Sequence, residues 1–194
     1  MESLLSGIRY RHWPVDDAKA CVLLAHGLAE HTGRYEHVAA RLNERGVAVV
    51  GPDHIGHGAS PGVRVYLKAF SEYLEPMQTL RAHIDDWYPG RPVFLMGHSM
   101  GGLISAHLLL ISQAVFQGAM LSGPAFHAVD PAPAPLMLIG RLLRYLLPKL
   151  GMVSLDANGV SRDPAVVADY LADPLVYNGK ITTGLGIEMM DAME

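Results

Sequence analysis

The chain has 194 residues and a formal net charge of −4, and half of its residues are hydrophobic while 18% are charged. This balance is typical of a globular domain and excludes a disordered chain. Lysine and arginine form no cluster, so we expect no nucleic-acid partner. The single cysteine, Cys21, cannot form an internal disulfide. The sequence shows neither a signal peptide at its start nor a membrane-spanning apolar run, and it predicts a cytoplasmic protein.

Short apolar runs alternate with helical patterns in the first part of the chain, which is typical of α/β proteins. A weak strand is expected over residues 7–13. Apolar runs that stop at glycine or polar turns predict buried strands at 20–25, 47–50, 92–96 and 116–121. Helical spacing predicts helices at 35–44, 71–88 and 99–111. We therefore expect a mostly parallel sheet with helices on both faces.

The composition changes after residue 124. Residues 129–150 open with prolines and continue as a helix of about 12 residues that is apolar on most faces. Asp163 and Pro164 form the N-cap and first-residue signal of a short helix that ends before Pro174. The closing GIEMMDAME has the pattern of a helix interior. We interpret residues 1–124 as the N-terminal part of a core and 125–194 as a helical cap over the strand ends.

A glycine and serine motif carries the predicted chemistry. Gly97-His98-Ser99-Met100-Gly101 lies directly after a predicted strand and directly before a predicted helix. A nucleophile elbow needs this context, because the serine sits on a strained turn and the flanking glycines allow close packing. We therefore predict that Ser99 is a catalytic nucleophile. The alternative is a plain tight turn.

A second motif, His26-Gly27-Leu28, follows the first buried strand. An oxyanion hole needs two backbone N–H groups aimed at the place where negative charge develops. In a fold with a nucleophile elbow, one donor is the residue after the serine and the other comes from the loop after an earlier strand. The sequence therefore predicts the N–H groups of Leu28 and Met100 as oxyanion donors.

A third motif, DHIGHGAS at residues 53–60, follows the second buried strand. We interpret it as a structural turn. Its two histidines, His54 and His57, are three residues apart and could chelate a metal together. No third ligand of suitable spacing lies nearby, so we expect no metal site.

With these three motifs, the sequence resembles the monoglyceride lipase and lysophospholipase family, a serine aminopeptidase-type group of α/β-hydrolases. The matching segments are HGLAEHTGRY at 26–35, PDHIGHGASPG at 52–62, PVFLMGHSMGG at 92–102 and SRDPAVVADYLADPL at 161–175. The resemblance implies an α/β-hydrolase fold with a helical cap. It also implies that an acyl-enzyme on Ser99 cleaves the ester of a monoacylglycerol or a lysophospholipid, with no metal or organic cofactor.

The resemblance further implies a pocket for the polar head of a lipid substrate. Its expected border consists of Gly27, Glu30, Arg34, His98 and Tyr170. Each assignment also has a structural alternative. Glu30 and Arg34 have the spacing of an i,i+4 surface pair, and Tyr170 has the character of an amphipathic cap residue.

The apolar residues of the expected cap helix, 134–148, exceed what one buried face needs. They are Leu136, Met137, Leu138, Ile139, Leu142, Leu143, Leu146 and Leu147. The resemblance implies that the cap supplies an acyl channel, and such a helix can also enter a bilayer interface as a peripheral contact. The alternatives are burial against the core or against a second copy in a homodimer.

A serine nucleophile needs a general base, and the base needs an orienting acid. In this fold the chain order is serine, then Asp or Glu, then histidine. The histidines after Ser99 are His107 and His127, and no acidic residue lies between Ser99 and His127. His107 is about 12 Å along the helix from the serine, as the helix rise requires, so we expect it to pack elsewhere.

Members of the resembled family continue through further strands that carry the acid and the histidine. The sequence is therefore interpreted as a relative that stops before the C-terminal part of the core, either truncated or degenerate. Two alternatives stay open. One is a carboxylesterase, thioesterase or aminopeptidase of the same fold, and the other is a catalytically inactive fragment or binding scaffold.

Overall fold

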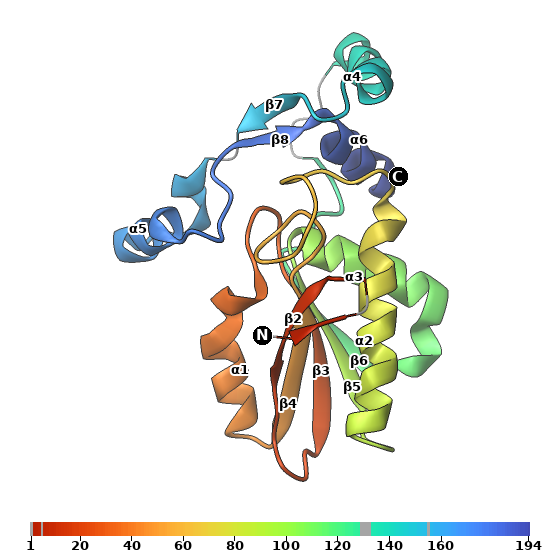
Figure 1. The fold of residues 1–194 in the computed structure, drawn as a ribbon, viewed down its shortest axis with the longest axis vertical. Coiled ribbons are helices and arrows are strands. Elements are labelled where there is room, and N and C mark those ends of the chain that lie inside the picture. Colours follow the sequence, from red (N-terminus) through yellow and green to blue (C-terminus); the bar gives the residue numbers. More distant parts are fainter. Residues whose placement is uncertain (1, 5, 129–132, 155) are drawn as a thin grey trace.

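A computed structural model describes residues 2–4, 6–128, 133–154 and 156–194. Its centre is a six-stranded sheet in the order β1-β2-β4-β3-β5-β6 (Figure 1). The strands are β1 (Glu2–Ser3), β2 (Arg9–Trp13), β3 (Ala20–Ala25), β4 (Val47–Pro52), β5 (Val93–His98) and β6 (Gly118–Ser122). Strand β2 is antiparallel to both of its neighbours, whereas β4, β3, β5 and β6 run parallel. The mostly parallel sheet confirms the predicted fold class.

Helices cover both faces of this sheet. They are α1 (Glu36–Asn43), α2 (Leu74–Trp87) and α3 (Met100–Ser112), with short 3-10 helices η1 (Thr32–Tyr35), η2 (Phe70–Tyr73) and η3 (Gln113–Val115). Alternate residues of β3 point to opposite faces. Val22 packs in the cluster of α1, while Cys21 and Leu23 pack in the larger cluster that contains α2 and α3. All of β3 is buried, which explains why its apolar run is uninterrupted.

The remaining elements lie beyond the C-terminal ends of the parallel strands (Figure 1). They are α4 (Ala134–Leu146), β7 (Gly151–Ser154), η4 (Ala157–Val160), α5 (Pro164–Ala172), β8 (Lys180–Thr182) and α6 (Thr183–Ala192). Strands β7 and β8 form an antiparallel pair. Helix α6 is fastened to the rest of the molecule, because Leu185 and Met189 pack in the larger cluster. Glu188 of the same helix accepts a hydrogen bond of 2.8 Å from the N–H of Phe70.

The element boundaries largely follow the sequence. Strand β3 has the predicted bounds, while β4 and β5 each extend two residues further, to Pro52 and His98. The predicted helix at 71–88 divides into η2 and α2. Asp163 is the N-cap of α5, and its side chain accepts the N–H of Ala165. The segment GIEMMDAME is helical over residues 186–192, as expected, and α6 ends at Ala192.

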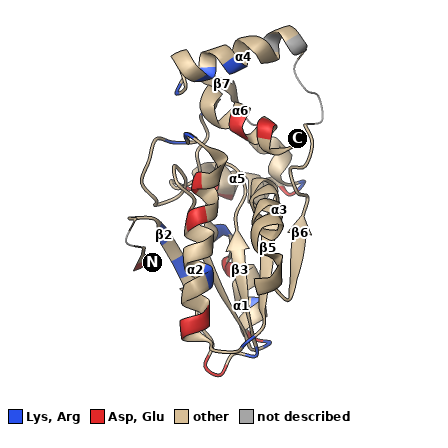
Figure 2. Ribbon diagram, turned by 90° about the vertical axis from the view of Figure 1, so that its right-hand side faces the viewer, with Lys and Arg blue, Asp and Glu red and all other residues tan. Residues whose placement is uncertain are grey.

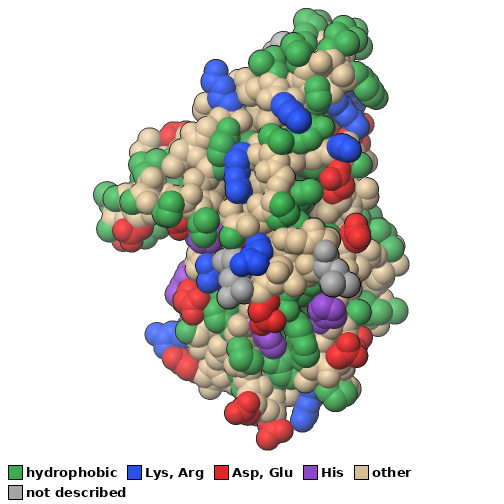
Figure 3. All heavy atoms as spheres, viewed as in Figure 1, with side chains coloured by type: hydrophobic (Ala, Val, Ile, Leu, Met, Phe, Trp, Pro, Cys, Tyr) green, Lys and Arg blue, Asp and Glu red, His purple; other side chains and the backbone are tan. Residues whose placement is uncertain are grey.

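Helix α4 exposes apolar side chains. Leu138 is 71% exposed, Leu142 59% and Leu146 67%, and hydrophobic atoms gather over this helix in Figure 3. The expected alternative of burial against the core therefore does not hold for these three residues, and the side chain of Leu136 lies outside the described residues. Within the described part of the chain, no helix has the length and apolarity needed to cross a membrane.

The polar side of α4 faces α6. Arg144 forms ion pairs with Glu188 and, at 3.1 Å, with Asp191, and Arg141 forms one with Asp191 at 3.0 Å. Figure 2 shows the basic residues of α4 above the acidic residues of α6. These pairs hold the apolar side of α4 outward.

Candidate active site

Ser99 occupies the sharp turn between β5 and α3, with φ 51° and ψ −117°. A non-glycine residue in this region carries about 1–3 kcal/mol of strain. The two glycines of the motif make the turn possible. A Cβ atom at Gly97 would meet the carbonyl of Gly101 and the hydroxyl of Ser105, and one at Gly101 would meet the carbonyl of Ala25.

Backbone hydrogen bonds fix the turn. The N–H of Ser99 donates to the carbonyl of Ser122 at 3.0 Å, which ties the turn to the end of β6. The Ser99 carbonyl accepts from the N–H of Gly102 at 2.9 Å and of Ala125 at 3.0 Å. The serine is therefore held from both sides in a conformation that an isolated chain would avoid.

The loop after β3 presents one free backbone donor beside this serine. The N–H of Gly27 donates to Glu30 Oε1 at 2.6 Å, whereas the N–H of Leu28 has no acceptor among the described residues. Met100 is the first residue of α3, so its N–H has no acceptor within the helix. The N–H groups of Leu28 and Met100 therefore stay the candidate oxyanion donors.

Leu28 and Ser99 line one cavity of about 450 Å³. The structure brings to this cavity six of the residues expected at the site, namely Gly27, Leu28, Glu30, Arg34, His98 and Tyr170, together with Ser99. The cap adds lining residues that sequence reasoning missed: Asp156, Ala157, Gly159, Val160, Tyr177, Asn178 and Gly179. The turn composition of Tyr177-Asn178-Gly179, directly after the cap segment 161–175, was the available signal.

Glu30 and Arg34 form the predicted i,i+4 ion pair, with Arg34 Nε 3.1 Å from Glu30 Oε2. The pair is not a surface pair, because the Glu30 side chain is only 12% exposed. The guanidinium of Arg34 lies 4.5 Å from the ring centre of Tyr170 on α5, a cation–π distance. The Tyr170 ring is therefore part of the cavity wall, attached to the loop after β3.

The histidines near the site are engaged with other groups. His26 is buried; its Nδ1 lies 2.7 Å from the Gly27 carbonyl, and its Nε2 accepts the N–H of His54. Nδ1 of His98 lies 2.9 Å from the Ser122 carbonyl, and Nε2 of His107 lies 2.8 Å from the Ala192 carbonyl. His127 is exposed. In the described residues, the Ser99 hydroxyl has no hydrogen bond to a histidine.

His54 and His57 are buried side by side with His26 and Tyr73. Burial lowers the pKa of all three histidines, that of His57 to about 3. The ring nitrogens of His54, Nε2 of His57 and the hydroxyl of Tyr73 have no protein partner. No three metal-ligating side chains group together in the parts of the chain that the structure describes. The cluster is therefore a set of neutral, buried rings behind the loop after β3.

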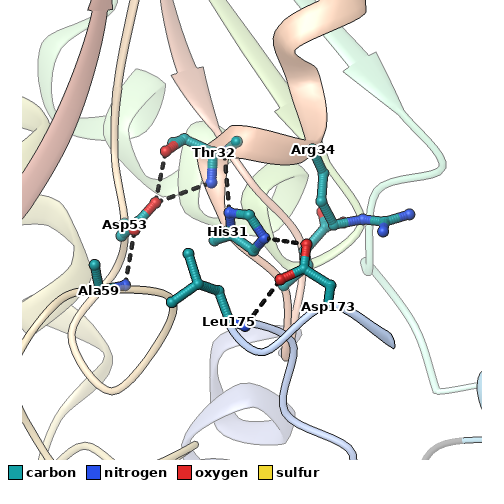
Figure 4. A network of polar contacts seen from close by, with 9 residues as sticks. His31, Thr32, Arg34, Asp53, Ala59, Asp173 and Leu175 are labelled. Atoms are coloured by element: carbon teal, nitrogen blue, oxygen red, sulfur yellow. Dashed lines mark hydrogen bonds and ion pairs between the residues drawn. The ribbon is translucent and has the colours of Figure 1, made fainter. Parts of the chain in front are cut away.

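Asp53 of the third motif organises the backbone around the site (Figure 4). Its Oδ1 accepts the N–H and the hydroxyl of Thr32, at 2.9 and 2.5 Å, and its Oδ2 accepts the N–H of Ala59 at 2.9 Å. The neighbouring His31 reaches the opposite way, to Asp173 of the cap, at 2.9 Å. Asp53 thus joins the two loops that follow β3 and β4.

A mostly parallel sheet with helices on both faces and a serine on a strained strand-to-helix turn define an α/β-hydrolase. The profile of the serine aminopeptidase S33 family matches residues 16–194. The chain belongs to this family.

Curated relatives agree with this assignment. A monoacylglycerol lipase of Mycolicibacterium smegmatis is 42% identical over 184 residues, which cover 93% of this chain and 66% of the relative. The human monoglyceride lipase is 34% identical, with 94% of this chain and 61% of the relative covered. The crystal structure of the Paleococcus ferrophilus monoacylglycerol lipase superimposes with a TM-score of 0.83 at 30% identity, over 96% of this chain and 70% of that one. The chain thus spans 61–70% of the length of these relatives.

Proposed function

We propose that Ser99 is the nucleophile of a serine ester hydrolase that acts on monoacylglycerols or lysophospholipids. The observation that carries this proposal is the strained Ser99 turn at the wall of a cavity that Leu28 also lines. The names of the relatives, which are monoacylglycerol lipases, support the monoacylglycerol as substrate.

In the proposed reaction, Ser99 Oγ attacks the ester carbonyl carbon, and the N–H groups of Leu28 and Met100 stabilise the resulting oxyanion. The alcohol leaves with a proton, and water then releases the fatty acid from the acyl-enzyme. In the described residues, no histidine ring is hydrogen-bonded to the Ser99 hydroxyl, and the partners of His26, His98 and His107 include no carboxylate that could orient a base. We therefore assign the general base and its acid to the part of the relatives' length that this chain does not span.

The polar head of the substrate is assigned to the part of the cavity between Arg34, His98 and Tyr170. Arg34 keeps donors that Glu30 does not use, since only its Nε is bonded to Glu30. The ring of His98 is fixed through Nδ1, which leaves Nε2 for a hydroxyl of the head group. These side chains suit a neutral, hydroxyl-bearing head.

The outer surface of α4 is assigned to contact with a lipid interface as a peripheral attachment. Its exposed leucines support this role, because burying such side chains in lipid is favourable. A homodimer through the same surface is the other way to cover them. We also propose the division into a core at 1–124 and a cap at 125–194, with α6 as the cap element that is fixed to the core.

The test uses two proteins: the 194-residue chain and a chimera that continues with the C-terminal third of the Mycolicibacterium smegmatis relative. The chimera is expected to release fatty acid from monooleoylglycerol, and Ser99→Ala is expected to lower that rate at least about a thousandfold. Ser112→Ala, at the far end of α3, is the matched control. A lysophospholipid and a short-chain ester assayed in parallel separate the substrate classes.

The 194-residue chain itself is expected to hydrolyse a short-chain ester far more slowly than the complete relative. Turnover at the rate of the relative, abolished by Ser99→Ala, would show that a base lies within these residues. Turnover in the chimera that survives Ser99→Ala would overturn the assignment of the nucleophile.

A further inference from the structure

Both carboxylate oxygens of Glu30 are occupied within the protein. Oε1 accepts the N–H of Gly27 at 2.6 Å and the hydroxyl of Tyr35 at 2.6 Å. Oε2 accepts Nε of Arg34 at 3.1 Å. A carboxylate with three short internal donors has little capacity left for a substrate hydroxyl. Its partners instead point to a role in the shape of the loop after β3.

The bond to Gly27 fixes the peptide that precedes the proposed oxyanion donor. A Cβ atom at Gly27 would lie 2.8 Å from Glu30 Oε1, so a glycine is needed for the carboxylate to come this close. Ala29 has φ 65°, which folds the chain back and brings Glu30 onto Gly27. Burial and the charge of Glu30 raise the pKa of Tyr35, so its hydroxyl stays protonated and keeps donating. Glu30 therefore fixes the peptide unit directly before the one that carries the Leu28 N–H.

The cap is attached to this same short loop at three points. Arg34, which is paired with Glu30, lies under the ring of Tyr170 at 4.5 Å. The N–H of Tyr177 donates to the Ala29 carbonyl at 2.8 Å. Asp173 accepts from His31 at 2.9 Å. A shift of the cap segment 170–177 would therefore move or strain the loop that carries the Leu28 N–H.

We propose that Glu30 is a positioning residue. Its carboxylate anchors the His26–Gly27 peptide, directly before the peptide that presents the Leu28 N–H, and couples the position of this loop to the cap through Arg34 and Tyr170. The inference rests on the proposed function in one respect, the assignment of the Leu28 N–H as an oxyanion donor. While the cap keeps its contacts with Arg34, the oxyanion hole keeps its shape. If the cap is displaced, the loop that carries the Leu28 N–H is expected to distort.

The first test compares Glu30→Gln with Glu44→Gln, an exposed glutamate of the neighbouring segment. Amide hydrogen exchange of the isotopically labelled 194-residue chain is followed by NMR. Glu30→Gln is expected to speed exchange at Gly27 at least about tenfold, because a charge-assisted hydrogen bond is lost, and to move the Gly27 amide proton upfield. Glu44→Gln is expected to change neither, and amides of β3 and β5 report global stability. Unchanged exchange at Gly27 in a folded Glu30→Gln variant would overturn the proposal.

The second test examines the cap end of the coupling and does not depend on the folding of Glu30→Gln. Tyr170→Ala removes the ring under which Arg34 lies, and Tyr170→Phe keeps it. Exchange at Gly27 is expected to speed up at least threefold in Tyr170→Ala, on the order of the loss of one exposed cation–π contact, and to stay unchanged in Tyr170→Phe. Equal effects of the two variants, or none in Tyr170→Ala, would overturn the coupling through the cap.

These readouts need no turnover, so they separate the two proposals. An inactive chimera, together with the expected faster exchange in Glu30→Gln and Tyr170→Ala, would refute the proposed function and leave the coupling intact. An active chimera whose Glu30→Gln variant keeps its kcat, and whose loop exchange is unaltered, would refute the coupling alone. If the coupling holds, Glu30→Gln in the chimera lowers kcat more than it raises KM, as expected for a group that acts through the transition state.

Discussion

His31 Nε2 lies 2.9 Å from the carboxylate of Asp173, a residue 142 positions further along the chain. Because Nδ1 of the same ring accepts the N–H of Gly33, His31 is fixed in the tautomer that donates to Asp173 through Nε2. The other oxygen of Asp173 accepts the N–H of Leu175 at 2.8 Å. One carboxylate thus closes the turn after α5 and ties it to the loop after β3. Burial alone would raise the pKa of Asp173, but these hydrogen bonds lower it.

Asp173→Ala is expected to lower the free energy of unfolding by about 1–3 kcal/mol, because it leaves the buried Nε2–H of His31 and the Leu175 N–H without acceptors. Urea denaturation measures this loss. Trypsin should also cut faster at the exposed Arg162 and Lys180, since the cap segment loosens. Asp169→Ala, an exposed aspartate on α5, is the control, and equal midpoints for the two variants would contradict the prediction.

The stability of the protein is expected to fall in mild acid because of His26, His54 and His57. Their pKa values are lowered by burial, so between pH 6.5 and their folded values the unfolded chain binds more protons than the folded one. The stability is therefore complete above about pH 6.5 and decreases as the pH falls, by up to about 1.4 kcal/mol per pH unit for each histidine.

Urea midpoints measured from pH 7.5 down to pH 5 check this expectation. His57→Asn should flatten the pH dependence, whereas His37→Asn, at an exposed position of α1, should leave it unchanged. A midpoint that stays constant over this range would mean that the buried histidines do not remain neutral in the folded protein.

The strands of the core could be predicted because their signals are local. Every residue of β3 is buried and a glycine follows two residues after its end, so the run of apolar letters and the strand coincide. The β7–β8 pair was missed for the opposite reason. Lys180–Thr182 is only three residues long, and its partner Gly151–Ser154 lies about one helix and several turns earlier in the chain. Such pairing is decided by tertiary packing, and the sequence of a short polar strand contains no pattern that predicts it.

The site divides in the same way. Ser99 and Leu28 could be named as candidates because each follows closely after a strand and lies beside a glycine in the sequence. The role proposed for Glu30 could not be predicted from the sequence, because the i,i+4 spacing to Arg34 is the same in a surface pair and in a buried one. What distinguishes the two is the approach of the Gly27 N–H to the carboxylate. That approach depends on the positive φ of Ala29. An alanine in the sequence gives no sign that its backbone adopts this uncommon conformation.

Gly101→Ala is expected to destabilise the protein by about 1–3 kcal/mol or more, because the added methyl group would meet the backbone carbonyls of Ala25 and His26. Thermal and urea denaturation measure the loss. Gly186→Ala is the matched control on α6, where a Cβ atom meets nothing within 4 Å. It should be neutral or stabilising by up to about 1 kcal/mol, since alanine favours a helix. A tolerated Gly101→Ala would show that α3 can move away from β3.

Vesicle flotation tests the lipid contact of α4. The triple variant Leu138→Gln, Leu142→Gln and Leu146→Gln is expected to weaken binding to phosphatidylcholine vesicles at least tenfold, because each leucine contributes about 1.5–3 kcal/mol when fully buried in an apolar phase. Leu110→Gln with Ile111→Gln, exposed at the end of α3, is the control. Added salt should have little effect, since Arg141 and Arg144 are already paired with acidic residues of α6. Equal binding by the triple variant would exclude α4 as the contact.

Strand β6 is expected to make the 194-residue chain self-associate. It pairs with β5 on one side, and in the described parts of the chain no strand pairs with its other edge. Most of its residues are exposed, Met120 at 42%, and an open apolar edge is a template for another chain. Sedimentation should show association that rises with concentration and falls in Met120→Lys, because an edge lysine opposes pairing. Leu142→Lys is the control for association through the apolar side of α4 and should leave association through β6 unchanged. A monodisperse monomer with a cooperative melt would show that the edge of β6 is not a pairing site.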